Sequence, residues 1–189
     1  LWQGQNSSLW NYAMDQNFMN NGDASYFVEN DKVRFTDEAT TFKVELVGDL
    51  PCDTVFVDNT KAYTFSGSGA ITGHATLVKT GTGRLNITTD NTYTGGNRLS
   101  GGVVSVSSLS NANQAHGNLG GVTTKPTDFI MENGAVLQTS AAVQMGSPIR
   151  FEGEEGGSIN NSADFAMNKA FSGTVLTKSG GGWLKTYAT

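Results

Sequence analysis

The sequence contains one cysteine, Cys52, only three prolines, and 15% charged residues among its 189 positions. A single cysteine can form neither an internal disulfide nor a cysteine-based metal cluster, which excludes disulfide-stapled and zinc-ribbon folds. The 12 basic residues are outnumbered by 17 acidic ones, so there is no basic footprint and we expect no nucleic-acid partner. No apolar run approaches the roughly 18 residues of a membrane helix, and we expect no membrane insertion by this segment.

The start of the chain also lacks two common features. It does not begin with methionine, and its first residues, Leu-Trp-Gln-Gly, do not form a signal peptide. We therefore expect the chain to be part of a longer protein, with the remainder of that protein as one of its partners.

Small and polar residues take the place of the missing types. Glycine, threonine, asparagine and serine number 24, 22, 17 and 16, more than two fifths of the chain. All four weaken the interior of a helix, which argues against a helical bundle. Disorder is equally disfavoured, because 37% hydrophobic residues can build a core and the net charge is only −5. The composition predicts an all-β protein with many tight turns.

The hydrophobic pattern divides the chain into two parts. Residues 1–31 are rich in aromatic side chains and show little periodicity, and we interpret them as an N-terminal cap or lead-in. Residues 32–189 contain short alternating runs, such as Val33 with Phe35 and Val55 with Val57, separated by glycine-rich clusters. Such runs indicate strands of three to five residues with one buried face, joined by turns. The best candidate for a short helix is 163–170.

Two architectures can use such strands. A β-sandwich joins strands by hairpins about every 8–12 residues, whereas a β-solenoid repeats its strands at a fixed coil length. Internal repetition favours the solenoid, since Leu77–Leu85 and Leu176–Leu184 share the pattern Leu-x-Lys-x-Gly-x-Gly-x-Leu, 99 residues apart. We expect coils of about 20–24 residues, with the β-sandwich as the alternative.

The residues of the motif suit a corner between two consecutive strands. The two leucines would point inward from consecutive strands, the glycines would allow the backbone to turn, and the lysines would face solvent. The first copy comprises Leu77, Lys79, Gly81, Gly83 and Leu85, followed by Tyr93, Gly95 and Gly96; the second comprises Leu176, Lys178, Gly180, Gly182 and Leu184.

These motifs resemble the autotransporter-associated β-strand repeat, also called the passenger-associated transport repeat. The resemblance covers Leu77-Val-Lys-Thr-Gly-Thr-Gly-Arg-Leu-Asn-Ile, then Asn91-Thr-Tyr-Thr-Gly-Gly, then Ser100-Gly-Gly-Val-Val. It implies a right-handed parallel β-helix in a protein secreted by, or displayed on the outer surface of, a Gram-negative bacterium. The sequence departs from the family pattern at Arg84, Trp183 and Arg98.

A search for catalytic chemistry finds no constellation. The carboxylates of Asp31, Asp37 and Glu38, and those of Glu152, Glu154 and Glu155, lie in turn-like contexts with no indicated partner across a cleft. Lys125 with Asp128 fits a solvated turn better than the base and metal ligand of a lyase, and His74 and His116 have no partner at metal-ligand spacing. We predict no catalytic residues, no metal site and no cofactor.

The N-terminal aromatic residues allow two interpretations. Trp2, Trp10 and Tyr12 could stack against sugar rings, or they could cover the open end of the solenoid, which we favour. We therefore expect a non-catalytic stalk, spacer or interaction surface of a secreted or surface protein, with polysaccharide or a cell-surface glycan as its partner. The alternatives are a fragment of a β-helix polysaccharide lyase or hydrolase, and a carbohydrate-binding module.

Overall fold

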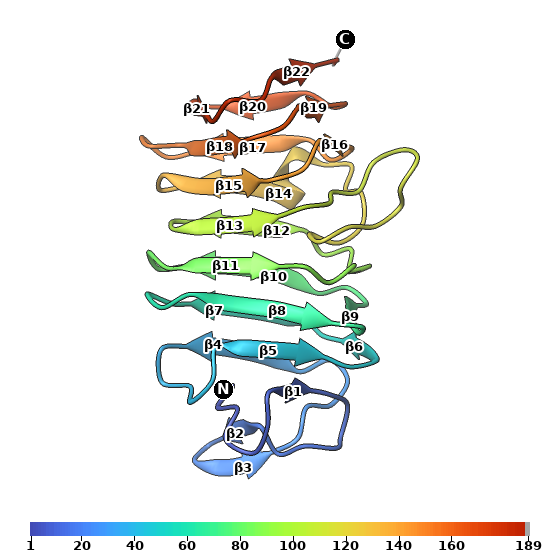
Figure 1. Ribbon diagram of the computed structural model, residues 1–189, viewed down its shortest axis with the longest axis vertical. Coiled ribbons are helices and arrows are strands. Elements are labelled where there is room, and N and C mark those ends of the chain that lie inside the picture. The colour runs from blue at the N-terminus through green and yellow to red at the C-terminus, as the bar shows by residue number, and fades with distance from the viewer. Residues whose placement is uncertain (188–189) are drawn as a thin grey trace.

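Strands stack coil upon coil along one axis in a computed structural model that describes residues 1–187 (Figure 1). Two long sheets run the length of this column. The first consists of β4 (Lys32–Thr36), β7 (Thr54–Asp58), β10 (Thr76–Thr80), β12 (Asn97–Ser100), β14 (Phe129–Glu132), β17 (Ile149–Glu152) and β20 (Phe171–Gly173). The second consists of β1 (Leu9–Trp10), β5 (Lys43–Leu46), β8 (Tyr63–Gly67), β11 (Arg84–Ile87), β13 (Val103–Val106), β15 (Ala135–Thr139), β18 (Gly157–Asn161) and β21 (Leu176–Ser179).

A third side is formed by shorter strands, each of which follows a strand of the second sheet in the chain. Near the N-terminal end it consists of β6 (Asp49–Pro51) and β9 (Ala70–Thr72), and near the C-terminal end of β16 (Val143–Met145), β19 (Phe165–Met167) and β22 (Leu184–Thr186). Irregular segments occupy this side between the two groups. The remaining elements are the hairpin of β2 (Phe18–Asn20) with β3 (Asp23–Ser25) and a 3-10 turn, η1 (Pro126–Asp128).

The register of the first sheet gives the coil length. Lys32, Thr54 and Thr76 lie beside one another in successive coils, 22 residues apart. One coil is longer, because Asn97 pairs with Phe129, 32 residues later. The extra residues lie within a loop, 107–124, that projects from the third side (Figure 1).

Parallel pairing confirms the β-solenoid and excludes the β-sandwich. Every pair of strands within the first, second and third sides is parallel, and β2–β3 is the antiparallel pair of named strands in residues 1–187. Parallel strands cannot be joined by tight hairpins, so each coil has to travel around the other sides before it returns. The short helix predicted at 163–170 is wrong: Phe165–Met167 form β19 there, held between β16 and β22.

The core is one continuous column of inward-facing side chains. Alternation along each strand directs every second residue inward, as in β7, where Val55 and Val57 are buried between less buried neighbours. Residues 1–31 lie at the N-terminal end of the column (Figure 1). They contribute four buried rings to the core, those of Trp2, Trp10, Phe18 and Phe27. No helix in residues 1–187 is long and apolar enough to cross a membrane.

Candidate functional site

The first copy of the repeat motif forms the corner between the first and second sheets. Leu77 on β10 and Leu85 on β11 are both buried, as predicted. Gly81 turns the chain between them with a φ of +72°, a left-handed conformation that costs other residues energy. A Cβ atom at Gly81 would lie 2.4 Å from the backbone oxygen of Asn59 in the coil below. The glycine is therefore required both by its own backbone and by the closeness of the neighbouring coil.

Asn59, in the preceding coil, holds this corner in place. The motif pattern did not identify it. Its buried side-chain amide donates to the backbone oxygens of Lys61, at 2.5 Å, and Arg84, at 3.0 Å. The second of these bonds ties one coil to the next. An asparagine precedes each motif copy by about one coil, and this repetition could have identified Asn59. It becomes visible only when residues of successive coils are compared, because it lies outside the motif.

Lys79 corrects a prediction. We expected its side chain to face solvent, but it is 0% exposed and its Nζ donates to the backbone oxygens of Thr80, at 2.5 Å, and Gly81, at 3.1 Å. The next coil covers it with Gly102, where a Cβ atom would lie 2.9 Å from the lysine Nζ. Burial lowers the pKa of Lys79 to about 8, against the opposing influence of the carboxylates of Asp58 and Asp37.

The buried lysine predicts a pH-dependent stability. Between pH 8 and its ordinary pKa of 10.5, Lys79 is protonated in the unfolded chain and increasingly neutral in the folded one, so unfolding takes up protons and the free energy of unfolding rises with pH. The full rise attributable to Lys79 is about 3 kcal/mol. Urea titrations at pH 7 and pH 10 should therefore show the wild type gaining stability relative to Lys79→Met.

The exposed lysine of the second motif copy provides the matched control. Lys178→Met should change stability equally at pH 7 and pH 10, because the Lys178 side chain is exposed to solvent. An equal effect of Lys79→Met at both pH values would contradict the prediction.

The second motif copy makes the same corner at a different place in the coil. It joins β21 of the second sheet to β22 of the third side, whereas the first copy joins the first sheet to the second. The hydrogen bonds are nevertheless equivalent: the amide of Asn161 donates to Ala163 O at 2.7 Å and Trp183 O at 3.1 Å, and Lys178 donates to Gly180 O at 2.6 Å. The motif therefore encodes a local corner and not a position in the coil.

The downstream part of the first motif also serves packing. Tyr93 is 2% exposed, and its hydroxyl donates to Oδ1 of Asn97 at 2.7 Å, while burial raises the pKa of the phenol. Gly95 approaches the backbone oxygen of His74, and Gly96, with a φ of +90°, approaches that of Asp128 in the next coil. These residues pack the chain tightly between the neighbouring coils.

The N-terminal tryptophans lie in the core. Trp2 and Trp10 are both 0% exposed, and Nε1 of Trp2 donates to the backbone oxygen of Thr41 at 3.0 Å. Neither ring offers a face to a sugar in this structure. Of the three candidate ligand-binding residues, Tyr12 is the one that remains on the surface, at 47% exposed.

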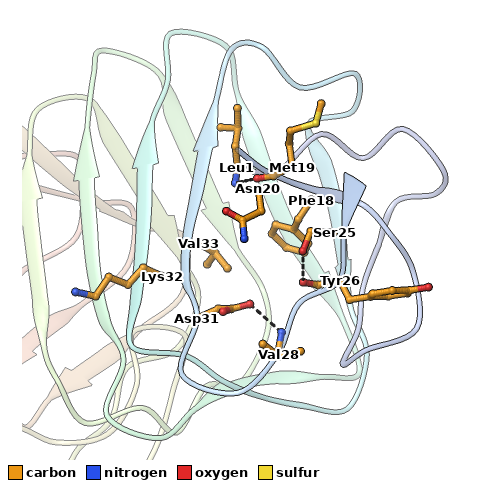
Figure 2. A pocket seen from close by; sticks show the side chains of 10 residues that line it. All are labelled: Leu1, Phe18, Met19, Asn20, Ser25, Tyr26, Val28, Asp31, Lys32 and Val33. Carbon is orange, nitrogen blue, oxygen red and sulfur yellow. Dashed lines mark hydrogen bonds between the residues drawn. The ribbon is translucent and has the colours of Figure 1, made fainter. Parts of the chain in front are cut away.

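The acidic residues near the N-terminal end serve local turns. Hydrogen bonds from the Thr60 hydroxyl and from backbone amides, including that of Lys61, hold the pKa of Asp37 below its usual range. Asp31 accepts a hydrogen bond from the Val28 backbone amide at 2.9 Å, beside a hollow of about 270 Å³ (Figure 2). Asp31 is the one carboxylate among the residues that line this hollow, whereas glycoside hydrolysis usually uses two.

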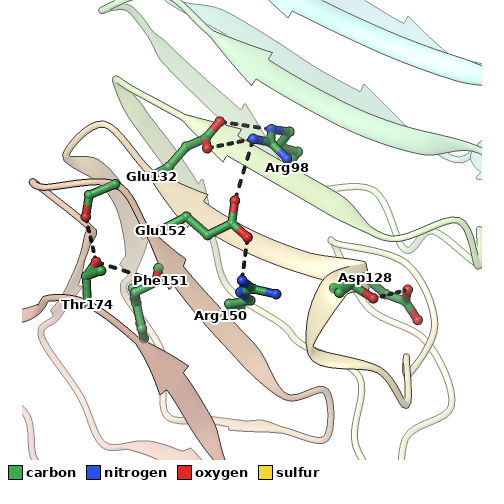
Figure 3. A network of polar contacts seen from close by, with 9 residues as sticks. Arg98, Asp128, Glu132, Arg150, Phe151, Glu152 and Thr174 are labelled. Carbon is green, nitrogen blue, oxygen red and sulfur yellow. Dashed lines mark hydrogen bonds and ion pairs between the residues drawn. The ribbon is translucent and has the colours of Figure 1, made fainter.

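Glu152 belongs to an ion-pair ladder on the outer face of the first sheet (Figure 3). Arg98 on β12 makes two bonds to Glu132 on β14, at 2.9 and 2.6 Å, and lies 3.7 Å from Glu152 on β17, which also pairs with Arg150 at 3.0 Å. The ladder links three successive coils. It gives Arg98, a departure from the family pattern, a structural role.

The other candidate groups remain apart from one another. His116 pairs with Asp90 at 2.7 Å on the surface, Asp128 lies at η1, and buried Cys52 is unpaired with another cysteine. Within residues 1–187, no group of three or more histidine, cysteine, aspartate or glutamate side chains is arranged to hold a metal ion. The stacked coils and their repeated corner define a β-solenoid built from sequence repeats.

Comparison with known proteins identifies the type of sequence repeat in this chain. Residues 77–106 match the family model of the passenger-associated transport repeat, so the chain carries such a repeat, as the motif indicated. The adhesin BmaC autotransporter of Brucella suis biovar 1 (strain 1330) is 31% identical to this chain over 129 residues. The match covers 64% of this chain and 4% of that relative, so the chain spans a small part of the relative's length. No solved structure matches the chain.

Proposed function

We propose that this chain is a non-catalytic segment of an autotransporter passenger, displayed at the outer cell surface as a stalk and interaction surface of an adhesin that contacts polysaccharide or cell-surface glycan. The observation that supports it most is the passenger-associated transport repeat at 77–106, set within a continuous parallel solenoid. The similarity to an autotransporter adhesin points the same way. Such a column holds its shape through contacts between neighbouring coils, which suits a spacer.

The contacts of the surface carboxylates favour a structural or binding role over a catalytic one. Asp37 supports a turn and Glu152 an ion-pair ladder, so two of the carboxylates that could have been catalytic have structural contacts instead. The purified chain should therefore release no new reducing or unsaturated ends from plant or bacterial polysaccharides.

Surface display can be tested on living cells. The tip of loop 107–124 is exposed at Ala112 and Asn113, and exposed loop tips tolerate insertions. We expect an epitope inserted between these two residues, in the parent gene of the encoding organism, to be labelled by antibody on intact cells. Labelling only after permeabilisation, with a periplasmic marker as the control for leakage, would contradict the proposal.

A further inference from the structure

A polar trough runs along the third side of the solenoid, between the projecting loop and the C-terminal strands. One part, of about 260 Å³, has Ser107, Ser108, Asn111 and Gln114 of the loop along one wall. An adjoining part, of about 220 Å³, continues over β19 and β22. The two parts share the lining residues Ala142, Val143 and Gln144, so they lie side by side, and together we call them the trough.

The loop wall is held rigidly by a buried asparagine. Oδ1 of Asn118 accepts hydrogen bonds from the backbone amides of Ser107, at 2.8 Å, and Ser108, at 2.9 Å. The side-chain amide of Asn118 donates a hydrogen bond to Thr89 O, at 2.9 Å, in the coil below. The backbone amide of Gly146 then donates to Ser110 O at 2.8 Å, which ties the loop to the segment that follows β16. Because these bonds join parts of the chain to one another, a ligand would have little loop ordering to offset.

The floor of the trough repeats along the solenoid axis. Gln144, Ala166 and Lys185 lie beside one another in successive coils of the third side. Neighbouring strands are about 4.8 Å apart, which is close to the length of one pyranose unit in an extended glycan. The small side chain of Ala166 leaves space between Gln144 and Lys185, and the carboxamide of Gln144 makes no hydrogen bond within residues 1–187.

The lining of the trough carries no net charge. The bond between Lys185 Nζ and Asp164 Oδ2, at 2.5 Å, raises the pKa of the lysine and lowers that of the carboxyl, so both are ionised at neutral pH and offset each other. Hydroxyl and carboxamide groups supply most of the remaining polar atoms, and they can donate and accept hydrogen bonds as sugar hydroxyls do. At the far end Tyr187, 62% exposed and held by its backbone amide to Met167 O at 2.9 Å, offers an aromatic ring.

We propose that this trough binds a neutral, extended glycan that runs parallel to the solenoid axis, with about one sugar unit per coil. The Gln144 carboxamide and the Ser108 hydroxyl, whose oxygen accepts a hydrogen bond from Gln114, bind the hydroxyl groups of the sugars. Ala166 admits a ring, and Tyr187 stacks against the next. The proposal deepens the adhesin function proposed above, because it identifies a contact surface and the chemistry of its ligand.

Calorimetric titration of the purified chain with cellohexaose, maltohexaose and the N-acetylglucosamine hexamer tests the trough, with the galacturonic acid hexamer as a charged comparator. We expect at least one neutral hexasaccharide to bind with a Kd of about 0.1–1 mM and the charged one to bind more weakly. Gln144→Ala and Tyr187→Ala should each weaken binding by about tenfold.

Two exposed residues outside the trough provide matched controls. Gln5→Ala and Tyr26→Ala remove the same kinds of side chain and should leave binding unchanged. The proposal is overturned if none of the three neutral hexasaccharides binds, or if the Gln5 and Tyr26 variants lose as much affinity as the trough variants. Because the titration uses purified protein, such a failure would not affect the surface-display result, which is measured on cells.

Discussion

Replacement of Trp10 by alanine should destabilise the solenoid by about 3–5 kcal/mol, because the substitution removes a fully buried indole and leaves a cavity. The Trp10 ring lies 5.3 Å from that of Phe35, 5.5 Å from that of Phe27 and 6.1 Å from that of Phe65, measured between centroids. It thus joins the N-terminal cap to the first coils. Urea denaturation followed by circular dichroism measures the loss.

Trp183 offers the control for this prediction. Its side chain is 73% exposed, so Trp183→Ala should change the free energy of unfolding by less than about 0.5 kcal/mol. If both substitutions cost the same small amount, the cap does not stabilise the column. A large cost at Trp10 alone would establish that the aromatic N-terminal region closes the core, the interpretation favoured from sequence.

Replacement of Gly81 by alanine should also be severe, with an expected cost of at least about 3 kcal/mol. The left-handed backbone alone costs an alanine about 1–2 kcal/mol, and the new Cβ atom would also meet the Asn59 backbone oxygen at 2.4 Å. Relief of that contact requires two coils to move apart. The measurement is again the free energy of unfolding in urea.

Gly48 separates the two contributions. It has the same φ of +72°, but a Cβ atom there would have no neighbour within 4 Å. Gly48→Ala should therefore cost only the conformational part, about 1–2 kcal/mol. Equal costs at the two positions would show that the spacing between coils does not constrain the motif glycine.

Much of the fold could be predicted because it is encoded locally. Alternation such as Val55 with Val57 depends on the period of a single strand, and the corner depends on glycines within the nine-residue motif. Both signals can be read without knowledge of the neighbouring coils. For this reason the second motif copy could be found although it lies at a different corner.

The burial of a side chain by the next coil could not be predicted from the local sequence. Lys79 is covered by Gly102, which has no side chain and therefore gives no hydrophobic signal. The polar trough is equally hidden, because stacking brings Asn111, Gln144 and Lys185 to one side from three separate coils. Serine, asparagine and glutamine are also abundant throughout the chain, so nothing in their local sequence marks them as a group.

The unequal coil lengths have a mechanical consequence. A force applied to the two ends of the chain would peel the column from an end, one coil at a time, because each coil is bonded to its immediate neighbours. A coil such as the one from Lys32 to Thr54 would release about 75 Å of extended chain. The coil from Asn97 to Phe129 would release about 110 Å, so a single-molecule extension trace would mark the loop-bearing coil by its longer step.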